Sequence, residues 1–144
     1  MVNGLPWTDA LLLGHAAMDR AHREFVDVVG AMTRCPDAAL PARLRDFIDH
    51  AQAHFGEEDR AMAETAFPAA ECHVDEHAAV LRSAHEVLER VGAGDVEIGR
   101  EFVAELVRWF PSHVAQLDSA LAHWQVKRRH GGAPVVVRRD LVRG

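Results

Sequence analysis

Residues 44–62 read LRDFIDHAQAHFGEEDRAM, and the pattern of this stretch indicates the fold class. Its apolar residues recur every three or four positions, which is the spacing of one face of an α-helix. Two polar residues, His54 and Glu58, fall in the same stripe. A buried imidazole or carboxylate costs free energy unless it is paired or coordinated. The stretch therefore predicts a core helix that also carries chemistry, with a stripe made of Leu44, Phe47, Ala51, His54, Glu58 and Met62.

The same helical spacing recurs in three further segments. We expect helices over about residues 16–33, 42–66, 69–91 and 96–125, separated by short turns that contain Pro or Gly. The other three stripes are Met18, His22, Phe25, Val29 and Met32; then His73, His77, Val80, Ala84, Val87 and Val91; then Leu106, Phe110, His113, Leu117, Leu121 and Trp124. Short connections place consecutive helices side by side and antiparallel. The prediction is an all-α, up-down-up-down antiparallel four-helix bundle.

The length of 144 residues suits one domain. We assign residues 1–130 to the bundle, with residues 1–15 as an extended N-terminal arm, and residues 131–144 to a short C-terminal tail. Residues 127–144 hold six basic residues and one acidic residue, a net +5, within a chain of net charge -6. The body is therefore acidic, which argues against nucleic acid as a partner. For the basic tail a solvated end is favoured, with an anionic surface as the alternative.

The composition also indicates where the protein works. The sequence has no run of about 18 apolar residues, so no membrane insertion is expected. Its first residues lack the basic and apolar regions of a secretory signal. The two cysteines, Cys35 and Cys72, do not form a disulfide framework. We expect a cytoplasmic protein.

Imidazoles and carboxylates occupy predicted core positions in every helix. His54 and Glu58 are four residues apart, as are His73 and His77, so each pair leaves one face of its helix. His22 adds one imidazole from the first helix. A bare carboxylate is almost never tolerated in a core. One metal site that uses all of these groups is the simplest explanation.

The fourth helix supplies a wider pair, His113 and Asp118, which are five residues apart. On an ideal helix they would point about 140° apart, so the pair needs a wide cavity or local overwinding. Two metal ions would supply such a cavity. Structural zinc sites close with about four ligands, whereas five histidines and two carboxylates suit an oxygen-bridged pair of irons. If both carboxylates bridge, one iron keeps an open position.

The order and spacing of these residues resemble the hemerythrin family in its single-domain bacterial form. The family pattern is a histidine on the first helix, then HxxxE, HxxxH and HxxxxD, and it is present here as His22, His54 with Glu58, His73 with His77, and His113 with Asp118. Flanking residues also match, namely Trp7, Gly14, Asp19, Phe55 and Trp109. The resemblance covers roughly residues 7–125, and motifs of this length and order are specific.

The resemblance implies a non-haem di-iron centre that binds O2 reversibly for carriage, storage or delivery, in a protein that is not an enzyme. It assigns the six-coordinate iron to His73, His77 and His113, the open iron to His22 and His54, and the bridges to Glu58 and Asp118. Candidate walls of the O2 pocket are Phe55, Met62, Trp109, Phe110 and Val114. An apolar pocket limits water entry, which protects a reversible carrier from autoxidation.

Two other functions would use the same centre. One is an O2 or redox sensor that reports to a signalling partner, although no signalling domain is expected within 144 residues. The other is a detoxifying protein that acts on peroxide or nitric oxide. The sequence shows no positioned general acid or base beyond the ligands, which weakens that alternative. For a carrier, the expected recipient is an oxygen-using enzyme.

Three further residues bear on the site. Pro111 precedes His113 by two positions and lacks a backbone N–H, so we expect a kink in the fourth helix. His50 lies one turn before His54. A surface or packing role is favoured for it, with a hydrogen bond to the site as the alternative. His15 is expected to cap the end of the bundle.

Overall fold

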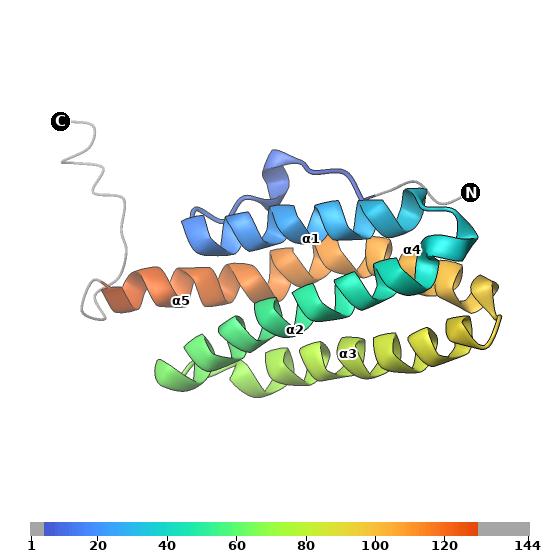
Figure 1. Ribbon diagram of the computed structural model, residues 1–144. Helices are drawn as coiled ribbons and strands as arrows, with labels where there is room; N and C mark the ends of the chain where they lie inside the picture. The colour runs from blue at the N-terminus through green and yellow to red at the C-terminus, as the bar shows by residue number, and fades with distance from the viewer. Residues whose placement is uncertain (1–4, 130–144) are drawn as a thin grey trace.

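Residues 5–129 are described by the computed structural model, and they form a bundle of antiparallel helices (Figure 1). The first three helices of the bundle are α1 (Ala16–Arg34), α2 (Leu40–Glu64) and α3 (Ala70–Gly92). The fourth is a continuous run of α4 (Val96–His113), the π-helical turn η3 (Val114–Asp118) and α5 (Ser119–Arg129). Both α2 and α4 pack against α1 and α3. The predicted all-α, up-down-up-down four-helix bundle is confirmed.

Side chains mark the starts of two helices. The Nδ1 atom of His15 accepts the Met18 N–H at 3.2 Å and caps α1. The Oδ1 atom of Asp95 accepts the Ile98 N–H at 3.2 Å and caps α4. Gly94, in the turn before this cap, has a φ of +106°, a backbone conformation that side chains with a Cβ rarely adopt. The short α3–α4 turn therefore depends on both a glycine and an aspartate.

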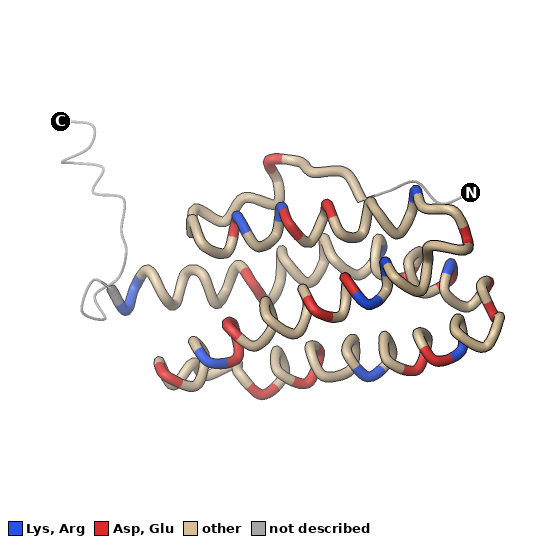
Figure 2. Tube along the Cα trace, in the orientation of Figure 1, with Lys and Arg blue, Asp and Glu red and all other residues tan. Residues whose placement is uncertain are grey.

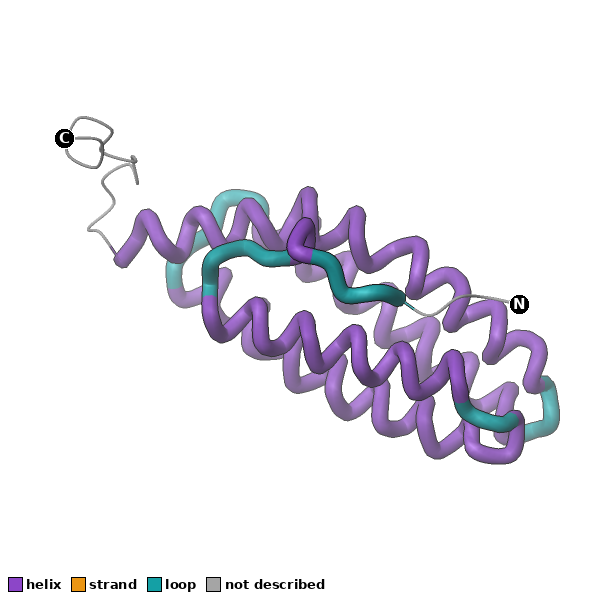
Figure 3. The backbone as a smooth tube through the Cα atoms, turned by 90° about the horizontal axis from the view of Figure 1, so that it is seen from above, coloured by secondary structure: helices purple, strands orange, loops and turns teal. Residues whose placement is uncertain are grey.

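The N-terminal arm runs along the bundle to the start of α1 (Figure 3), where hydrogen bonds attach it. The carboxylate of Asp19 accepts the backbone N–H of Leu13 at 2.8 Å and that of Gly14 at 3.2 Å. The arm was predicted to be extended, and it contains one 3-10 turn, η1 (Asp9–Leu11). Within residues 5–15, the buried side chains are Leu5 and Leu11, each 6% exposed. The arm is thus part of the folded core.

The core contains a larger and a smaller apolar cluster. The larger one extends to the α1–α2 and α3–α4 turns, where it includes Leu40, Leu44, Phe47, Val91 and Val103. We call these five residues the apolar end. The smaller cluster lies toward the other end of the helices and consists of Met18, Met62, Leu121 and Ala122. Between the two clusters along each helix lie the buried histidines and carboxylates.

Charged positions are spread along all the helices (Figure 2), and acidic residues outnumber basic ones in the chain by 22 to 16. Within residues 5–129, no helix is long and apolar enough to cross a membrane. The basic tail, residues 131–144, and its boundary with the bundle lie outside the described residues, and the division into residues 1–130 and 131–144 stays a prediction.

Candidate metal centre

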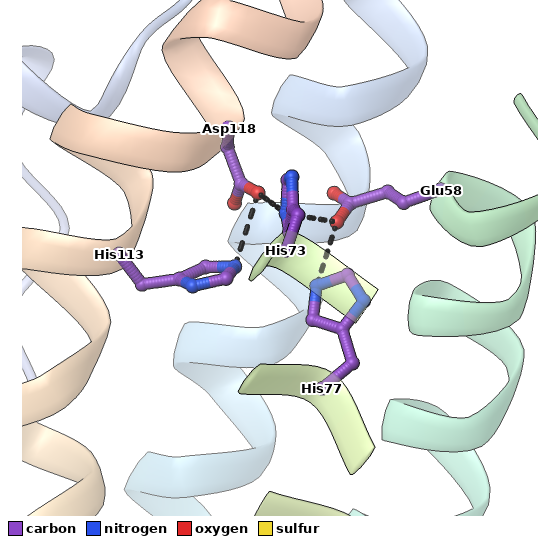
Figure 4. A group of neighbouring side chains, drawn as sticks. All are labelled: Glu58, His73, His77, His113 and Asp118. Atoms are coloured by element: carbon purple, nitrogen blue, oxygen red, sulfur yellow. Dashed lines mark ion pairs between the residues drawn. The ribbon is translucent and has the colours of Figure 1, made fainter. Parts of the chain in front are cut away.

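All seven candidate ligands meet between the two apolar clusters. Their nitrogen and oxygen atoms form two groups, and within each group the atoms lie within 4.8 Å of one another. The five-residue group, shown in Figure 4, contains Glu58, His73, His77, His113 and Asp118. The four-residue group contains His22, His54, Glu58 and Asp118. The two carboxylates therefore belong to both groups.

Glu58, on α2, turns one carboxylate oxygen toward each group. Its Oε1 atom lies 3.2 Å from His77 Nε2 and 3.5 Å from His73 Nε2. Its Oε2 atom lies 3.2 Å from His54 Nε2 and 3.7 Å from His22 Nε2. The two oxygens of Glu58 therefore face different groups of imidazoles.

Asp118 divides its oxygens in the same way. Its Oδ1 atom lies 2.8 Å from His73 Nε2 and 3.1 Å from His113 Nε2, within the five-residue group. Its Oδ2 atom lies 2.9 Å from His22 Nε2, within the four-residue group. Asp118 and Glu58 reach His73 from two different helices (Figure 4). All five histidines thus direct Nε2 toward the two carboxylates.

Burial makes this arrangement costly without a cation. The seven side chains belong to residues that are at most 5% exposed. Both oxygens of Glu58 and of Asp118 are buried and make no hydrogen bond within residues 5–129. The same holds for the Nε2 atoms of His22, His73, His77 and His113. Buried polar atoms are seldom left unpaired, and metal cations would satisfy all of these at once. The residues therefore fit a metal centre, and a nitrogen and oxygen donor set suits iron.

A π-helical turn brings His113 and Asp118, which are five residues apart, into the same group. In η3 the Ser119 N–H donates to the Val114 carbonyl, an i→i+5 bond of the π-helical type. We expected a wide cavity or local overwinding, and the overwinding was wrong, because the helix is locally underwound. The turn also changes which residue faces the core, from Leu117 to Asp118. Asp118 is fully buried, whereas Leu117, which was predicted for the core, is only half-buried.

Two carboxylates that were not predicted as site residues lie within hydrogen-bond distance of the Nδ1 atoms of candidate ligands. Asp59 Oδ1 lies 2.8 Å from His77 Nδ1. Glu76 Oε1 lies 2.9 Å from His113 Nδ1 and also accepts the indole N–H of Trp109 at 3.0 Å. An Nδ1–H that donates to a carboxylate orients the ring and leaves Nε2 available to a metal. Each carboxylate stands beside a candidate ligand in the sequence, which is the one signal that points to it.

The other expectations near the site have mixed outcomes. Pro111 is exposed, and α4 continues through it to His113, so the kink stays a prediction. The ring of His50 lies nearly parallel to that of His54, with 5.9 Å between their centroids. The Nε2 atom of His50 makes no hydrogen bond within the described part of the chain. The packing role favoured for His50 agrees with this contact.

The mixed charges of the site shift its pKa values in both directions. Burial opposes protonation of His22 and His73, but Asp118 and Glu58 raise the pKa of each imidazole to about 9. Burial lowers the pKa of His54 to about 4. Burial also acts to raise the pKa of the two carboxyl groups, but the surrounding imidazoles hold both below their usual range. Before a cation binds, the ionised carboxylates of Glu58 and Asp118 would therefore pair with protonated His22 and His73.

A cavity of about 120 Å³ reaches the four-residue group between α1, α2 and α5. Two candidate ligands, His54 and Glu58, form part of its wall. Apolar side chains, among them Met18, Ala61 and Leu121, form much of the rest. The cavity thus borders the group that contains fewer imidazoles.

The five residues predicted to wall an O2 pocket do not line this cavity. Phe55 stacks on the imidazole of His77, with 4.0 Å between ring centroids. Trp109 stacks on His113 at 4.2 Å. The other three are at most 1% exposed in the core: Met62, Phe110 and Val114. Their role in enclosing O2 stays a proposal.

Comparison with known proteins agrees with the site. The sequence profile of the Hemerythrin HHE cation binding domain matches residues 13–124. A bacteriohemerythrin of Ralstonia nicotianae is 37% identical over 124 residues, which cover 86% of this chain and 90% of that protein. A bacteriohemerythrin of Stenotrophomonas maltophilia is 29% identical over 127 residues, which cover 85% and 82% respectively. With this match over most of its length and all seven candidate ligands gathered in one bundle core, the chain belongs to the hemerythrin family.

Proposed function

We propose that this chain holds two non-haem iron ions and binds O2 reversibly, for carriage, storage or delivery. The observation that carries the proposal is the division of each carboxylate between two groups of imidazoles. A single ion would use one oxygen each of Glu58 and Asp118 and leave the other two buried against imidazoles without a metal cation. Two ions, one in each group, would satisfy all four oxygens. Membership of the hemerythrin family supports non-haem iron as the metal.

The two groups differ in how much of the ion they would surround. The five-residue group offers three imidazoles and the four-residue group offers two, while both share the same carboxylates. An ion in the four-residue group therefore has room for a ligand from outside. The cavity ends at this group, against His54 and Glu58. Two ferrous ions bound here would supply the reversible electron exchange that O2 binding requires.

The cavity suits a small uncharged molecule. Met18, Ala61 and Leu121 make part of its wall apolar, which disfavours charged ligands and water against that part, while His15, Glu57 and Gln125 line other parts. On the inner side, the ring of Phe110 lies edge-on to His22, with 5.5 Å between centroids. These side chains would hold O2 beside the four-residue group. They would also slow autoxidation, in which O2 leaves the site in a reduced form.

We propose a binding role and not an enzymatic one. The imidazoles and carboxylates of the centre would all serve as ligands, which leaves no separate acid or base at its inner surface. Among the other residues that line the cavity, His15 caps α1 and Glu57 is exposed. We place this activity in the cytoplasm, with an oxygen-using enzyme or a signalling partner as the recipient.

The test is an optical spectrum of protein reconstituted with ferrous iron without air, then exposed to O2, then returned to argon. We expect a visible band that appears with O2 and disappears under argon over repeated cycles. A band that gives way only to a stable ferric spectrum would contradict reversible carriage and favour a redox sensor. Sustained consumption of added peroxide or nitric oxide would favour the detoxifying alternative. A folded protein that takes up no iron would contradict the whole proposal.

The route of entry has its own test. Ala61→Leu should fill the cavity and slow O2 association, while the iron content stays unchanged, because Ala61 lines the cavity without being a candidate ligand. The matched control is Ala63→Leu, an exposed site two residues later on α2. Stopped-flow mixing with O2 measures both rates. Equal rates for the two variants would show that O2 enters elsewhere.

A further inference from the structure

The two halves of the centre differ in how firmly their imidazoles are held. In the five-residue group, His77 and His113 each donate Nδ1–H to a carboxylate, from Asp59 at 2.8 Å and Glu76 at 2.9 Å. Among the described residues, the Nδ1 atoms of His73 in the five-residue group and of His22 in the four-residue group are buried without a hydrogen-bond partner. Two of the three imidazoles of the five-residue group are therefore held at Nδ1 by a carboxylate, whereas neither imidazole of the four-residue group is. A fixed Nδ1–H tautomer keeps the Nε2 lone pair aimed at the metal position.

Ring packing follows the same division. His77 lies flat on Phe55, with an interplanar angle of 4°. His113 lies on Trp109 at 27°, and the indole N–H of Trp109 binds the same Glu76 oxygen that holds His113. These two imidazoles are therefore fixed both at Nδ1 and on a ring face. Binding to side chains that are already in place loses less conformational entropy.

In the four-residue group no carboxylate among the described residues holds an Nδ1 atom, and the one parallel ring contact is that of His50 with His54, at 5.9 Å between centroids; the group also borders a cavity. His22 meets neighbouring rings edge-on, at 79° to His54 and 83° to Phe110. His54 forms part of the cavity wall. An ion there would have two imidazoles in place of three, and less firmly oriented ones. The two metal positions are thus unequal in both the number and the preparation of their ligands.

We infer that the two positions fill in order, with the first ion entering the five-residue group, and that Glu76 and Asp59 are the positioning residues that set this order. The inference rests on the proposed two-metal centre. The first ion would bind to His73, His77 and His113 together with one oxygen of each carboxylate. It would also fix Glu58 and Asp118, which prepares their other oxygens for the second ion.

A zinc titration of metal-free protein labelled with ¹⁵N at histidine tests the order, because Zn²⁺ is diamagnetic. Up to one equivalent, the Nε2 resonances of His73, His77 and His113 should shift; those of His22 and His54 should shift during the second equivalent. Simultaneous shifts of all five, or earlier shifts of His22 and His54, would overturn the order. Saturation at one ion, or no binding by folded protein, would instead contradict the two-metal centre itself.

Substitutions at Glu76 separate positioning from general structure. Glu76→Ala should weaken binding of the first ion about 10- to 100-fold, and in metal-free protein the His113 Nδ1 resonance should show a mixture of tautomers. Glu76→Gln keeps a carbonyl oxygen for both N–H donors, so it should retain the tautomer and lose less affinity. Asp59→Asn should act in the same way on His77.

The matched control is Asp75→Asn, which removes one negative charge from the exposed residue next to Glu76. It should leave the zinc isotherm unchanged. An equal loss of affinity in Asp75→Asn and Glu76→Ala would show a charge effect without positioning. An unchanged His113 tautomer and an unchanged first-ion affinity in folded Glu76→Ala protein would overturn the role of Glu76.

Discussion

The apolar end and the metal centre are built from the same helices, yet they bury opposite kinds of side chain. At the apolar end Leu40, Leu44 and Phe47 are 0% exposed; at the centre His22 and Asp118 are equally buried. Burial of apolar surface stabilises the fold, whereas burial of charged groups costs desolvation energy that coordination must offset. One region therefore stabilises the fold, and the other uses that stability to hold ligands in place.

The largest expected effect comes from Phe47→Ala at the apolar end. The variant removes a fully buried ring that meets Phe25 at 5.6 Å between centroids. We expect the unfolding free energy of the metal-free protein to fall by about 3–5 kcal/mol, measured by urea denaturation. Because Phe47 is about 10 Å along α2 from His54, metal should stabilise this variant and the original protein equally. A folded variant that no longer binds metal would contradict the division between the two regions.

Arg100→Leu tests the link between α4 and the α1–α2 connection. The guanidinium of Arg100 donates to the carbonyls of Met32 at 2.8 Å and Cys35 at 2.7 Å, and to Asp37 at 2.8 Å. Loss of these charged donors should lower the unfolding free energy by about 1.5–3 kcal/mol. The control is Arg90→Leu, which breaks one exposed ion pair and should cost less than about 1 kcal/mol. Similar losses in both variants would show that Arg100 is an ordinary surface residue.

Gly99→Ala tests how closely the helices approach at the apolar end. A Cβ at Gly99 would lie 2.7 Å from Val91 Cγ2 and 2.8 Å from Leu40 Cδ2, so neighbouring side chains must move. We expect a loss of about 1–3 kcal/mol of unfolding free energy. Gly92→Ala is the control, because a Cβ there meets nothing within 4 Å. If thermal melts place both variants at the same stability, the close packing around Gly99 is not needed.

The centre should respond to pH where the apolar end does not. At pH 7 the metal-free protein carries protons on His22 and His73, whose pKa values are raised to about 9, and none on His54, whose pKa is lowered to about 4. Metal must displace the protons of His22 and His73. Zinc affinity should therefore rise from pH 7 to about 9 and level off above it. Calorimetry in buffers of different ionisation enthalpy counts the released protons, and an affinity that falls over this range would contradict the account.

Helical periodicity predicts the four helices and brings six of the seven candidate ligands onto their buried faces, whereas Asp118 reaches the buried face through η3. It does not predict η3, because no residue type marks an i→i+5 turn, and it therefore placed Leu117 in the core beside Asp118. Asp59 and Glu76 were missed for a related reason. Neighbours on a helix point about 100° apart, so residues beside a ligand are assigned to solvent. The cavity is set by how α1, α2 and α5 pack, which the sequence pattern does not contain.

The most direct test of the central claim is the number of iron ions that each folded chain retains. The protein is reconstituted with ferrous iron without air and freed of unbound metal, and its iron content is measured by elemental mass spectrometry. We expect two iron ions per chain. Its Mössbauer spectrum should resolve two unequal sites, in keeping with three imidazoles in one group and two in the other. One iron ion per fully loaded chain, or none in a folded chain, would contradict the account.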